Sequence, residues 1–291
     1  MIRRPEQSID RLPRVPAEPI LGPMKPSGKN PRPVVLTIAG SDSGGGAGVQ
    51  ADLKVFAALG VHGTTALTCL TAQTPAGVTG VQAVPSAFVA RQLEALAAEL
   101  PPSAAKTGML FNAAIVRTVA ATFRRHRGIP LVVDPVMIAT SGARLLRPDA
   151  MRALQDQLLP LAAVVTPNLD EAAALMGRPL RSLDDLRWAA RGIHGRWGVP
   201  ALVKGGHLRD EPMAVDVLWD GREERLLRAA FVRGVSTHGT GCTYSSAIAA
   251  FLALGHPLSE AVGNAKRVIT RAIARSTRLG PDGRHQALLP G

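Results

Sequence analysis

Residues 34–60 read VVLTIAGSDSGGGAGVQADLKVFAALG. The stretch opens with the apolar and β-branched run VVLTIA, which is typical of a buried strand. A glycine-rich turn follows, and then Val49, Leu53, Phe56 and Leu59 recur at helical spacing up to Gly60. A strand, a glycine turn and a helix in this order are the repeating unit of an α/β protein.

The same alternation continues along the chain. Short apolar runs recur at 64–71, 104–110, 131–137, 162–168 and 201–206, and helical patterns lie at 86–100, 112–126, 148–159, 170–177, 182–195, 241–254 and 257–275. Strands that are apolar on both faces and separated by helices predict a mostly parallel central sheet with helices on both sides, a three-layer α/β/α fold. Residues 214–236 predict an antiparallel excursion with a turn at Asp220–Gly221.

The domain organisation predicted from composition is simple. Residues 1–33 are basic and proline-rich without apolar periodicity, so we expect a disordered extension there. Residues 34–280 contain no interior linker and no repeat, which predicts a single domain. Residues 281–291 are expected to form a loose tail.

Composition excludes several classes of protein. The apolar fraction of 46% and the charged fraction of 19% are ordinary for a soluble globular chain. No apolar run reaches about 18 residues, and the first residues lack the apolar core of a signal peptide, so a cytoplasmic protein without a membrane partner is expected. The two cysteines are far apart and form no CxxC pair, which argues against a disulfide framework and a zinc site.

The net charge of +12 raises the alternative of a nucleic-acid-binding protein. Aromatic residues make up 3% of the chain and are not interleaved with its arginines, whereas a stacking platform for single strands needs them. A basic enzyme that acts on phosphates is the simpler interpretation, and no nucleic-acid partner is expected.

Polar residues follow each predicted strand at the point where the strand ends: Gly40 and Asp42, Gln73, Lys106, Asp134, Asn168 and Glu171, and Lys204 and Gly206. The carboxyl ends of parallel strands meet at one edge of a sheet, and ligands bind in the crevice there. This edge is therefore the candidate active site.

Two nucleotide-binding motifs fail. A dinucleotide fingerprint on GAGVQA (46–51) requires an acidic residue about 20 positions later, but residues 60–85 contain no Asp or Glu. A P-loop requires glycine directly before Lys-Ser/Thr, but Ala105 precedes Lys106 and Thr107.

The stretch STHGTGCTYSS (236–246) leads from glycines into a helix. Glycines at a helix N-terminus free backbone N–H groups to bind an anion. Cys242 in the first turn is then either a reactive thiol, whose pKa falls toward 7, or a packed apolar residue, and spacing alone leaves both open. Cys69, in the middle of an apolar strand, is expected to be packed.

Seven motifs in order between residues 34 and 275 carry a family resemblance. They are TIAGSDSGGGAGVQADLK, TAQT, KTGML, DPVMIATSG, TPNLDEAAAL, VKGGH and STHGTGCTYSSAIAA. Together they resemble the hydroxymethylpyrimidine/phosphomethylpyrimidine kinases of thiamine biosynthesis, in the ribokinase-like superfamily. The resemblance implies a ribokinase-like α/β fold with ATP and Mg²⁺. It also implies phosphorylation of 4-amino-5-hydroxymethyl-2-methylpyrimidine to the monophosphate and then to the diphosphate.

The resemblance also assigns roles to individual residues. It implies that Gln73 hydrogen-bonds the aminopyrimidine, in a pocket lined by Gly40, Asp42, Met109 and Val136. It places Gly239 and Gly241 in an anion hole, with Cys242 as the proton acceptor and Lys204 near the phosphates of ATP. The nucleotide and metal positions are Asn168, Gly206, Thr240 and Lys266 for ATP, and Asp134 and Glu171 for Mg²⁺.

Other interpretations of these residues stay open. Asp42 and Asp134 could cap turns, and Asn168 with Glu171 has the spacing of a helix capping box. His207 and His238 fit a phosphate edge better than a metal site, because no partner ligand stands at metal spacing. Thr74 occupies a position where the family commonly has asparagine, so the adjacent flap is expected to differ.

The closest alternative function is that of a pyridoxal or pyridoxine kinase in the same superfamily. Dedicated pyridoxal kinases usually carry aspartate at the position of Cys242, although some that are close to the present family keep the cysteine. The resemblance further implies a homodimer, since the superfamily often dimerises.

Overall fold

The computed structural model describes residues 31–137, 146–206, 208, 211–232, 235, 238–281, 283 and 285–290. The extension expected over residues 1–33 lies outside these described residues except for its last three.

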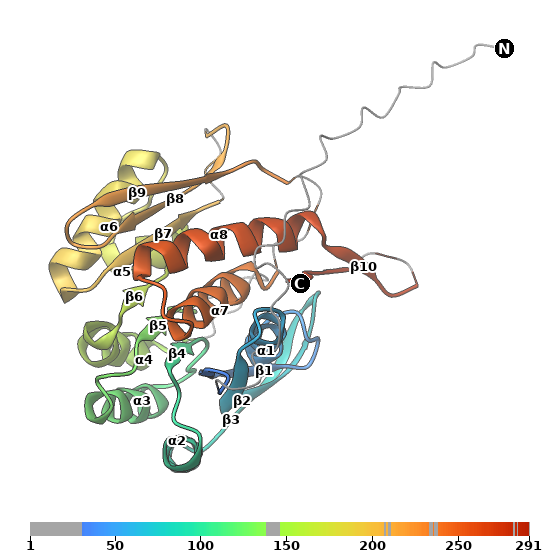
Figure 1. Ribbon diagram of the computed structural model, residues 1–291, viewed down its shortest axis with the longest axis vertical. Coiled ribbons are helices and arrows are strands. Elements are labelled where there is room, and N and C mark those ends of the chain that lie inside the picture. The colour runs from blue at the N-terminus through green and yellow to red at the C-terminus, as the bar shows by residue number, and fades with distance from the viewer. Residues whose placement is uncertain are drawn as a thin grey trace.

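A nine-stranded sheet forms the centre of the molecule, in the order β3-β2-β1-β4-β5-β6-β7-β8-β9 (Figure 1). Its strands are β1 Val34–Asp42, β2 His62–Thr74, β3 Gly77–Ala83, β4 Ala104–Thr107, β5 Leu131–Val133, β6 Val164–Val165, β7 Ala201–Gly205, β8 Ala214–Trp219 and β9 Glu224–Ala229. The strands from β2 to β7 in this order run parallel, whereas β3, β8 and β9 are antiparallel to their neighbours. The predicted mostly parallel sheet is confirmed.

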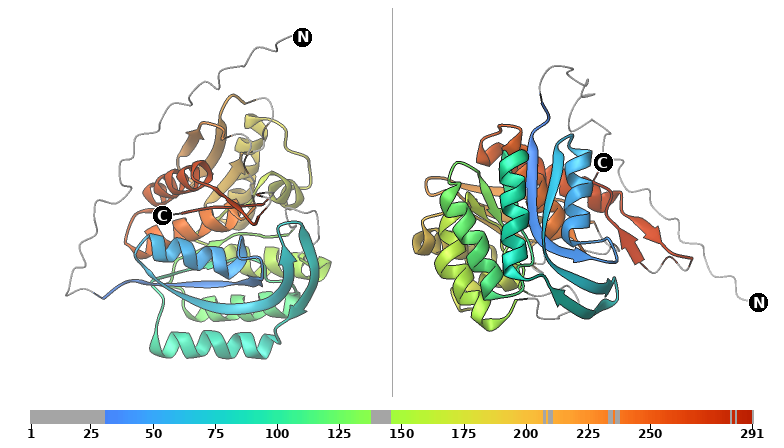
Figure 2. Two further views of the ribbon diagram at one scale, coloured as in Figure 1. Left: turned by 90° about the vertical axis from the view of Figure 1, so that its right-hand side faces the viewer. Right: turned by 90° about the horizontal axis from the view of Figure 1, so that it is seen from below.

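Helices cover both faces of the sheet, which gives the predicted three layers (Figures 1 and 2). They are α1 Gly48–Ala58, α2 Ser86–Glu99, α3 Ala113–Arg125, α4 Pro148–Ala153, α5 Leu169–Met176, α6 Leu183–Trp197, α7 Thr240–Ala253 and α8 Leu258–Ala274, with π and 3₁₀ turns at Leu154–Leu158 and Leu159–Leu161. One buried cluster joins the sheet to α2–α6, and a second joins it to α1, α7 and α8. The central strand β5 contributes to both clusters, and its three residues are fully buried.

The apolar stripe of α1 is rotated from the predicted one. Val49, Phe56 and Leu59 are buried as expected, but Leu53 is 36% exposed and Asp52 is fully buried. The acid stands three residues after Val49 and four before Phe56, so its position belongs to the inward-facing helix surface. A buried carboxylate must have partners, and those of Asp52 are Lys106, Thr37 and Ser246, each of which donates a hydrogen bond to it.

The sheet has antiparallel strands at both edges, and the sequence analysis predicted those at one edge only. The excursion over 214–236 is confirmed as the β8–β9 hairpin, in which Gly221 adopts φ +97°. Strand β3 was not predicted, because none of its residues is buried and two of its seven are glycines that weaken the strand pattern.

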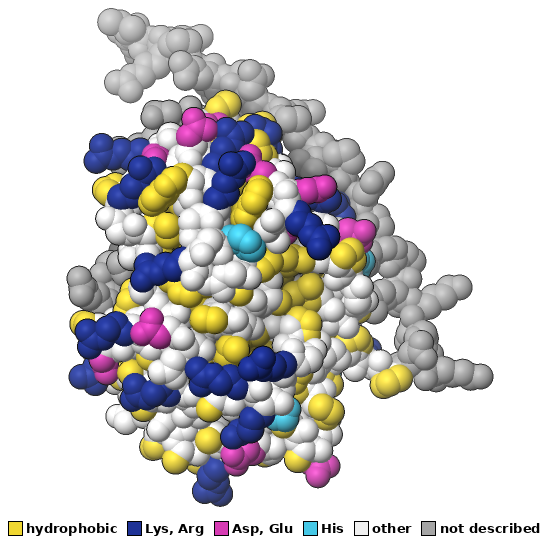
Figure 3. All heavy atoms as spheres, turned by 90° about the vertical axis from the view of Figure 1, so that its left-hand side faces the viewer, with side chains coloured by type: hydrophobic (Ala, Val, Ile, Leu, Met, Phe, Trp, Pro, Cys, Tyr) yellow, Lys and Arg dark blue, Asp and Glu magenta, His cyan; other side chains and the backbone are white. Residues whose placement is uncertain are grey.

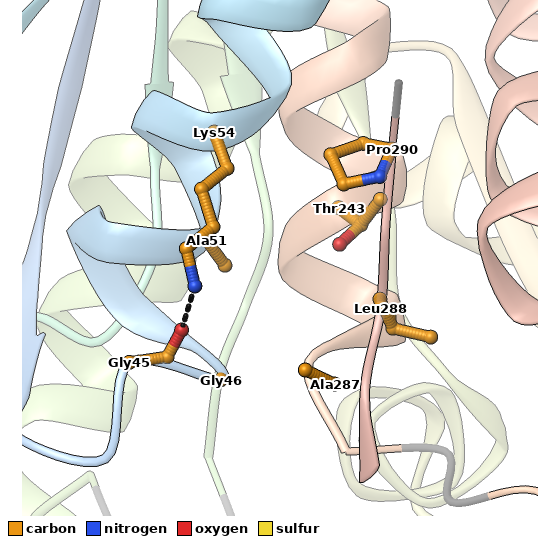
Figure 4. Close-up of a pocket in the computed structure, with 8 residues that line it drawn as sticks. All are labelled: Gly45, Gly46, Ala51, Lys54, Thr243, Ala287, Leu288 and Pro290. Atoms are coloured by element: carbon orange, nitrogen blue, oxygen red, sulfur yellow. Dashed lines mark hydrogen bonds between the residues drawn. The ribbon is translucent and has the colours of Figure 1, made fainter. Parts of the chain in front are cut away.

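The C-terminal residues are partly ordered, which corrects the expected loose tail over 281–291. Strand β11 His285–Ala287 pairs antiparallel with β10 Thr277–Leu279. Figure 4 shows Ala287, Leu288 and Pro290 beside Thr243 of α7 and facing the glycine turn before α1. The chain end therefore packs behind the loop that begins the candidate site.

On one face of the molecule the basic side chains are dispersed rather than gathered into a single patch. On the face in Figure 3, Lys and Arg side chains alternate with apolar and acidic ones over the whole surface. This distribution lacks the continuous basic stripe of a nucleic-acid-binding surface on that face. In the described part of the chain no helix has the length and apolarity to cross a bilayer.

Candidate active site

A cavity of about 710 Å³ lies along the carboxyl edge of the parallel strands and the N-terminus of α7. All the candidate site residues line it: Gly40, Asp42, Gln73, Met109, Asp134, Val136, Asn168, Glu171, Lys204, Gly206, Gly239, Thr240, Gly241, Cys242 and Lys266. The topology thus brings all of these residues to one surface, whereas Lys106, which also follows a predicted strand, is fully buried and does not line the cavity.

Asp42 caps the glycine turn at the end of β1. Its carboxylate accepts hydrogen bonds from the N–H groups of Gly44, Gly46 and Ala47 at 2.8, 3.0 and 2.7 Å. Burial alone would raise the pKa of Asp42, but hydrogen bonds from His238 and from these backbone groups outweigh it and lower the pKa. The turn-capping interpretation is confirmed for Asp42, which also lines the cavity.

The start of α7 packs directly on this turn, and only glycine fits at the contact. Gly239, the N-cap of α7, adopts φ +79°, and a Cβ there would lie 1.9 Å from the carbonyl oxygen of Gly46. The two glycine segments, residues 44–46 and 239–241, are distant in the sequence but are in direct contact in the fold. Backbone N–H groups at the N-terminus of α7 line the cavity as an anion-binding site would.

Cys242 lies in the first turn of α7 and is partly exposed to the cavity. Burial raises the pKa of its thiol to about 11, although Lys106 and the N–H of Gly48 act to lower it. Of the two alternatives that the sequence left open, this raised pKa favours the packed thiol in the protein without ligands. Burial and the nearby carboxylates of Asp52 and Asp134 outweigh the helix terminus.

Asp134, which follows β5, is the centre of a buried polar cluster. Its carboxylate receives hydrogen bonds from Lys204 Nζ at 3.0 Å, Ser245 Oγ at 3.1 Å and Thr166 Oγ1 at 3.3 Å. Burial would raise the pKa of Asp134, but Lys204 and Lys106 outweigh it and lower the pKa. The cluster joins the ends of β5 and β7 to α7.

Glu171 and Asn168 form the predicted capping box of α5. The Asn168 side chain accepts from the N–H of Glu171 at 2.9 Å, and the Glu171 carboxylate accepts from the N–H of Asn168 at 2.8 Å. Burial raises the pKa of Glu171 to about 7, in spite of Lys204, with Asp134 adding to the rise. A carboxyl of this kind would ionise readily beside a cation.

The two carboxylates Asp134 and Glu171 fit a magnesium ion that is bound mainly by phosphates and water. The described residues contain no group of three or more His, Cys, Asp or Glu side chains placed to hold a metal. Mg²⁺ in kinases uses one or two carboxylates together with substrate phosphates, so two acids are sufficient. Lys204, between them, contributes a further positive charge to the same place.

Gln73, at the end of β2, has its backbone and side chain both held. Ser43 Oγ donates to its carbonyl at 2.7 Å and accepts from its N–H at 2.8 Å, and Thr71 Oγ1 donates to its Oε1 at 3.2 Å. The described residues offer no acceptor for its Nε2, which lets the amide group donate to a ligand in the cavity.

Lys266 lines the cavity, but its ammonium group is already paired. Its Nζ lies 2.7 Å from Asp216 Oδ2, and the other oxygen of Asp216 accepts from the N–H of Gly205 at 3.0 Å. Tyr244 places a buried hydroxyl near Asp216, and burial together with that carboxylate raises the pKa of the hydroxyl. The sequence interpretation assigned no role to Tyr244, although it lies in the stretch 236–246, and it missed Asp216 and the apolar lining residues Ile269, Ile273, Phe231 and Val232.

The model of the family described as phosphomethylpyrimidine kinase matches residues 42–287, which include almost all of these site residues. The chain belongs to this family. It is 47% identical over 248 residues to a hydroxymethylpyrimidine/phosphomethylpyrimidine kinase from Synechococcus elongatus, with 85% of this chain and 94% of that protein covered. It is 48% identical over 250 residues to the thiamine biosynthesis bifunctional protein ThiED from Geobacter sulfurreducens. That match covers 86% of this chain but 51% of the relative.

Solved structures of two kinds resemble this family member. A phosphomethylpyrimidine kinase from Clostridium difficile has a TM-score of 0.74 and 40% identity, covering 83% of this chain and all of that one. An ADP complex of pyridoxal kinase from Bacillus subtilis has a TM-score of 0.81 and 38% identity, covering 89% of this chain and 97% of that one. The ribokinase-like fold is confirmed, and nucleotide binding is established for a close structural neighbour.

Proposed function

We propose that the protein transfers phosphate from ATP to the hydroxymethyl group of 4-amino-5-hydroxymethyl-2-methylpyrimidine, and then phosphorylates the monophosphate to the diphosphate. The main support is the single cavity that carries all the candidate residues in a chain of the phosphomethylpyrimidine kinase family. One end of this cavity suits an aminopyrimidine and the other a nucleotide, with the N-terminus of α7 between them.

The pyrimidine end is formed by Gln73, Met109 and Gly40. Gln73 offers an amide that both donates and accepts, as the amino and ring-nitrogen edge of an aminopyrimidine requires. A Cβ on Gly40 would lie 2.7 Å from Cys69 Sγ and 3.6 Å from Met109 Sδ, so the close packing of β1 on its neighbours at this point requires glycine. Asp42 and Val136 complete the lining.

Phosphoryl transfer takes place at the N-terminus of α7. The backbone N–H groups beginning with Gly239 and Gly241 stabilise the negative charge that develops on the transferred group. Cys242, in its thiolate form, accepts the proton of the attacking hydroxyl as that oxygen bonds to phosphorus and the bond from phosphorus to ADP breaks, and Lys204 holds the phosphates of the donor. Asp134 and Glu171 would hold Mg²⁺, which would supply neutralisation of the phosphate charge.

The nucleotide end lies between α8 and the residues after β9. Apolar side chains there, among them Phe231, Ile269 and Ile273, suit the face of an adenine ring. Asn168, Gly206 and Thr240 lie between this end and the transfer site. The ammonium group of Lys266 is paired with Asp216, so Lys266 holds that carboxylate in place. It contacts ATP only if a phosphate of the nucleotide displaces Asp216 from the ammonium group.

A pyridoxal kinase activity is the second candidate, and the similarity to the Bacillus subtilis pyridoxal kinase favours it as a side activity. Pyridoxal also presents a hydroxymethyl group on a six-membered aromatic ring, so the same transfer geometry serves it. The curated relatives named as pyrimidine kinases at 47–48% identity favour the pyrimidine as the main substrate.

The decisive experiment measures ADP formation by the purified protein with Mg·ATP and one of three acceptors. The acceptors are hydroxymethylpyrimidine, its monophosphate and pyridoxal. We expect turnover with both pyrimidines and at least tenfold lower kcat/KM with pyridoxal. Turnover with pyridoxal alone would overturn the proposal.

The assembly and location of the protein belong to the same proposal. A homodimer predicts twice the 30.5 kDa mass of one chain in sedimentation equilibrium, and a mass of one chain would contradict it. A cytoplasmic location is supported by two unpaired cysteines, one of them buried.

A further inference from the structure

Asp216 contributes a buried carboxylate to the wall of the cavity, and the proposed reaction gives it no step. It lies in β8, and its side chain is 3% exposed. Asp216 Oδ2 pairs with Lys266 Nζ of α8 at 2.7 Å, and the Lys266 side chain is 12% exposed. Burying an ion pair gains little stability by itself, because desolvation of both charges offsets their attraction. The position of this pair is therefore the feature that requires an explanation.

The other oxygen of Asp216 contacts the end of β7. Asp216 Oδ1 accepts a hydrogen bond from the N–H of Gly205 at 3.0 Å, and this contact is buried. Gly205 stands between Lys204 and Gly206, which both line the cavity. One carboxylate thus joins β7, β8 and α8 at the edge where the phosphates of the nucleotide are expected.

The end of β7 requires an anchor of this kind. Gly205 and Gly206 are adjacent, and glycine populates more backbone conformations than any other residue. A larger residue does not fit at the first position, since a Cβ on Gly205 would lie 2.3 Å from the carbonyl oxygen of Val215 and 2.4 Å from Leu186 Cδ2. The chain therefore lacks the stiffness that a side chain would give it here. The hydrogen bond to Asp216 restrains the backbone at this point.

Lys204 is positioned to pair with Asp216 but pairs elsewhere. The two residues are directly opposite in the β7–β8 ladder, so their side chains leave the sheet on the same face. The Lys204 ammonium instead lies 3.0 Å from Asp134 Oδ1, at the transfer site. Because Lys266 pairs with Asp216, the two lysines have separate places, one beside the transferred phosphate and one in the wall of the cavity.

We propose that Asp216 is a positioning residue for the nucleotide: it is held by Lys266 and fixes the Gly205 N–H, and thereby the backbone that presents Lys204 and Gly206 to the phosphates. This inference rests on the proposed use of ATP, and it assigns the Lys266 ammonium to Asp216 rather than to the nucleotide. Charge alone would act in the opposite direction, because a carboxylate repels phosphates. Weaker nucleotide binding after loss of this carboxylate would therefore report lost positioning.

The test compares two double variants that both lack the ion pair. Asp216→Asn with Lys266→Met keeps an oxygen that accepts from the Gly205 N–H, whereas Asp216→Leu with Lys266→Met has a similar side-chain shape and no acceptor. Isothermal titration calorimetry measures the Kd for ADP and, separately, for hydroxymethylpyrimidine. We expect ADP binding within about threefold of wild type in the amide variant, and about tenfold weaker or more in the leucine variant. The Kd for the pyrimidine should stay within about threefold in both.

Arg187→Met with Glu224→Leu is the matched control. It removes an ion pair of 2.9 Å between α6 and β9, formed by two residues that do not line the cavity, and it should leave both Kd values unchanged. Wild-type ADP binding in the leucine variant would overturn the inference. An equal loss in both double variants would also overturn it, since Lys266 would then contact the nucleotide itself.

A thermal melt shows whether each variant is folded. If the leucine variant is not folded, Asp216→Ala with Lys266→Met takes its place, because it also lacks the acceptor and requires less room. Tenfold weaker ADP binding in the folded amide variant overturns the inference without either of them. Calorimetry requires no turnover, so a wild-type protein that binds ADP but phosphorylates neither pyrimidine would disprove the proposed function and leave this result standing. A wild-type protein that binds no ADP would overturn both.

Discussion

Gln73 is the residue whose proposed role is easiest to separate from general damage to the site. Gln73→Ala removes the amide but keeps the backbone hydrogen bonds with Ser43. We expect the KM for the pyrimidine to rise about 10- to 100-fold, as is typical when a hydrogen-bonding site loses its partner, while the KM for ATP stays within about threefold. Steady-state kinetics with each substrate varied in turn provide the measurement.

The matched control for that variant is Gln82→Ala on the neighbouring strand. Gln82 is exposed and donates to the carbonyl of Ala83, away from the cavity. Both KM values should remain at their wild-type levels. Equal losses of pyrimidine and ATP affinity in Gln73→Ala would contradict the assigned role.

Glu171 predicts a pH dependence of stability in the metal-free protein. Its pKa is about 7 in the folded state, against an ordinary value of 4.5. Between these two values the unfolded chain releases the proton first, so the free energy of unfolding falls as the pH rises from about 4.5 to 7. Below this window Glu171 is protonated in both states and contributes nothing to the dependence.

Glu171→Gln should remove that fall, which is on the order of a few kcal/mol. Urea unfolding at pH 5 and pH 8 in EDTA measures the difference. Asp170→Asn, in the same turn of α5 but exposed, is the control and should keep the wild-type slope. If the free energy of unfolding of Glu171→Gln depended on pH as that of the wild type does, the Glu171 carboxyl would already be ionised at pH 5, which would contradict the prediction.

The start of α7 governs the site at the level of secondary structure. Gly239→Ala would place a methyl group 1.9 Å from the carbonyl oxygen of Gly46 and force a positive φ on an alanine. The two glycine segments must then separate. We expect a loss of at least 2 kcal/mol in the free energy of unfolding, and kcat reduced at least 100-fold because the N–H groups no longer converge.

Gly263→Ala is the control for the same substitution in a neighbouring helix. Gly263 lies in α8, and a Cβ there would meet no atom within 4 Å. Alanine in a helix interior should stabilise the protein by about 0.5–1 kcal/mol and leave turnover unchanged. Wild-type kcat in Gly239→Ala would disprove the role of this contact.

The sequence predicted the position of the site but not the buried contacts around it. The ends of the parallel strands were predictable from apolar runs that stop at polar residues or glycine, and they sufficed to bring Gln73, Asp134 and Lys204 to one edge. The ion pair between Lys106 and Asp52 was not predicted, because in the sequence Asp52 is one polar residue among several in a helical pattern. Its presence on the inward stripe, between Val49 and Phe56, was the available signal. The choice between the two alternatives for Cys242 could not be made from the sequence, because burial depends on tertiary packing.

At the level of the whole molecule, the described fold from residue 31 contains both buried clusters and every candidate site residue. Deletion of residues 1–30 should therefore leave kcat/KM within about twofold and the thermal midpoint within a few degrees. Kinetics and a thermal melt of the truncated protein test this. A folded truncation that has lost turnover would assign a function to the extension.

The hydrogen bond between Asp52 and Ser246 joins residues 194 positions apart in the chain. At about 5–20 residues per second, a ribosome takes roughly 10–40 s to add that length. During this interval β1, β2, β4 and β5 can pair, but the sheet face that α7 covers stays exposed to water. A cell that makes this enzyme must therefore keep a half-covered sheet from aggregating, and no unfinished chain can carry activity before α7 is synthesised.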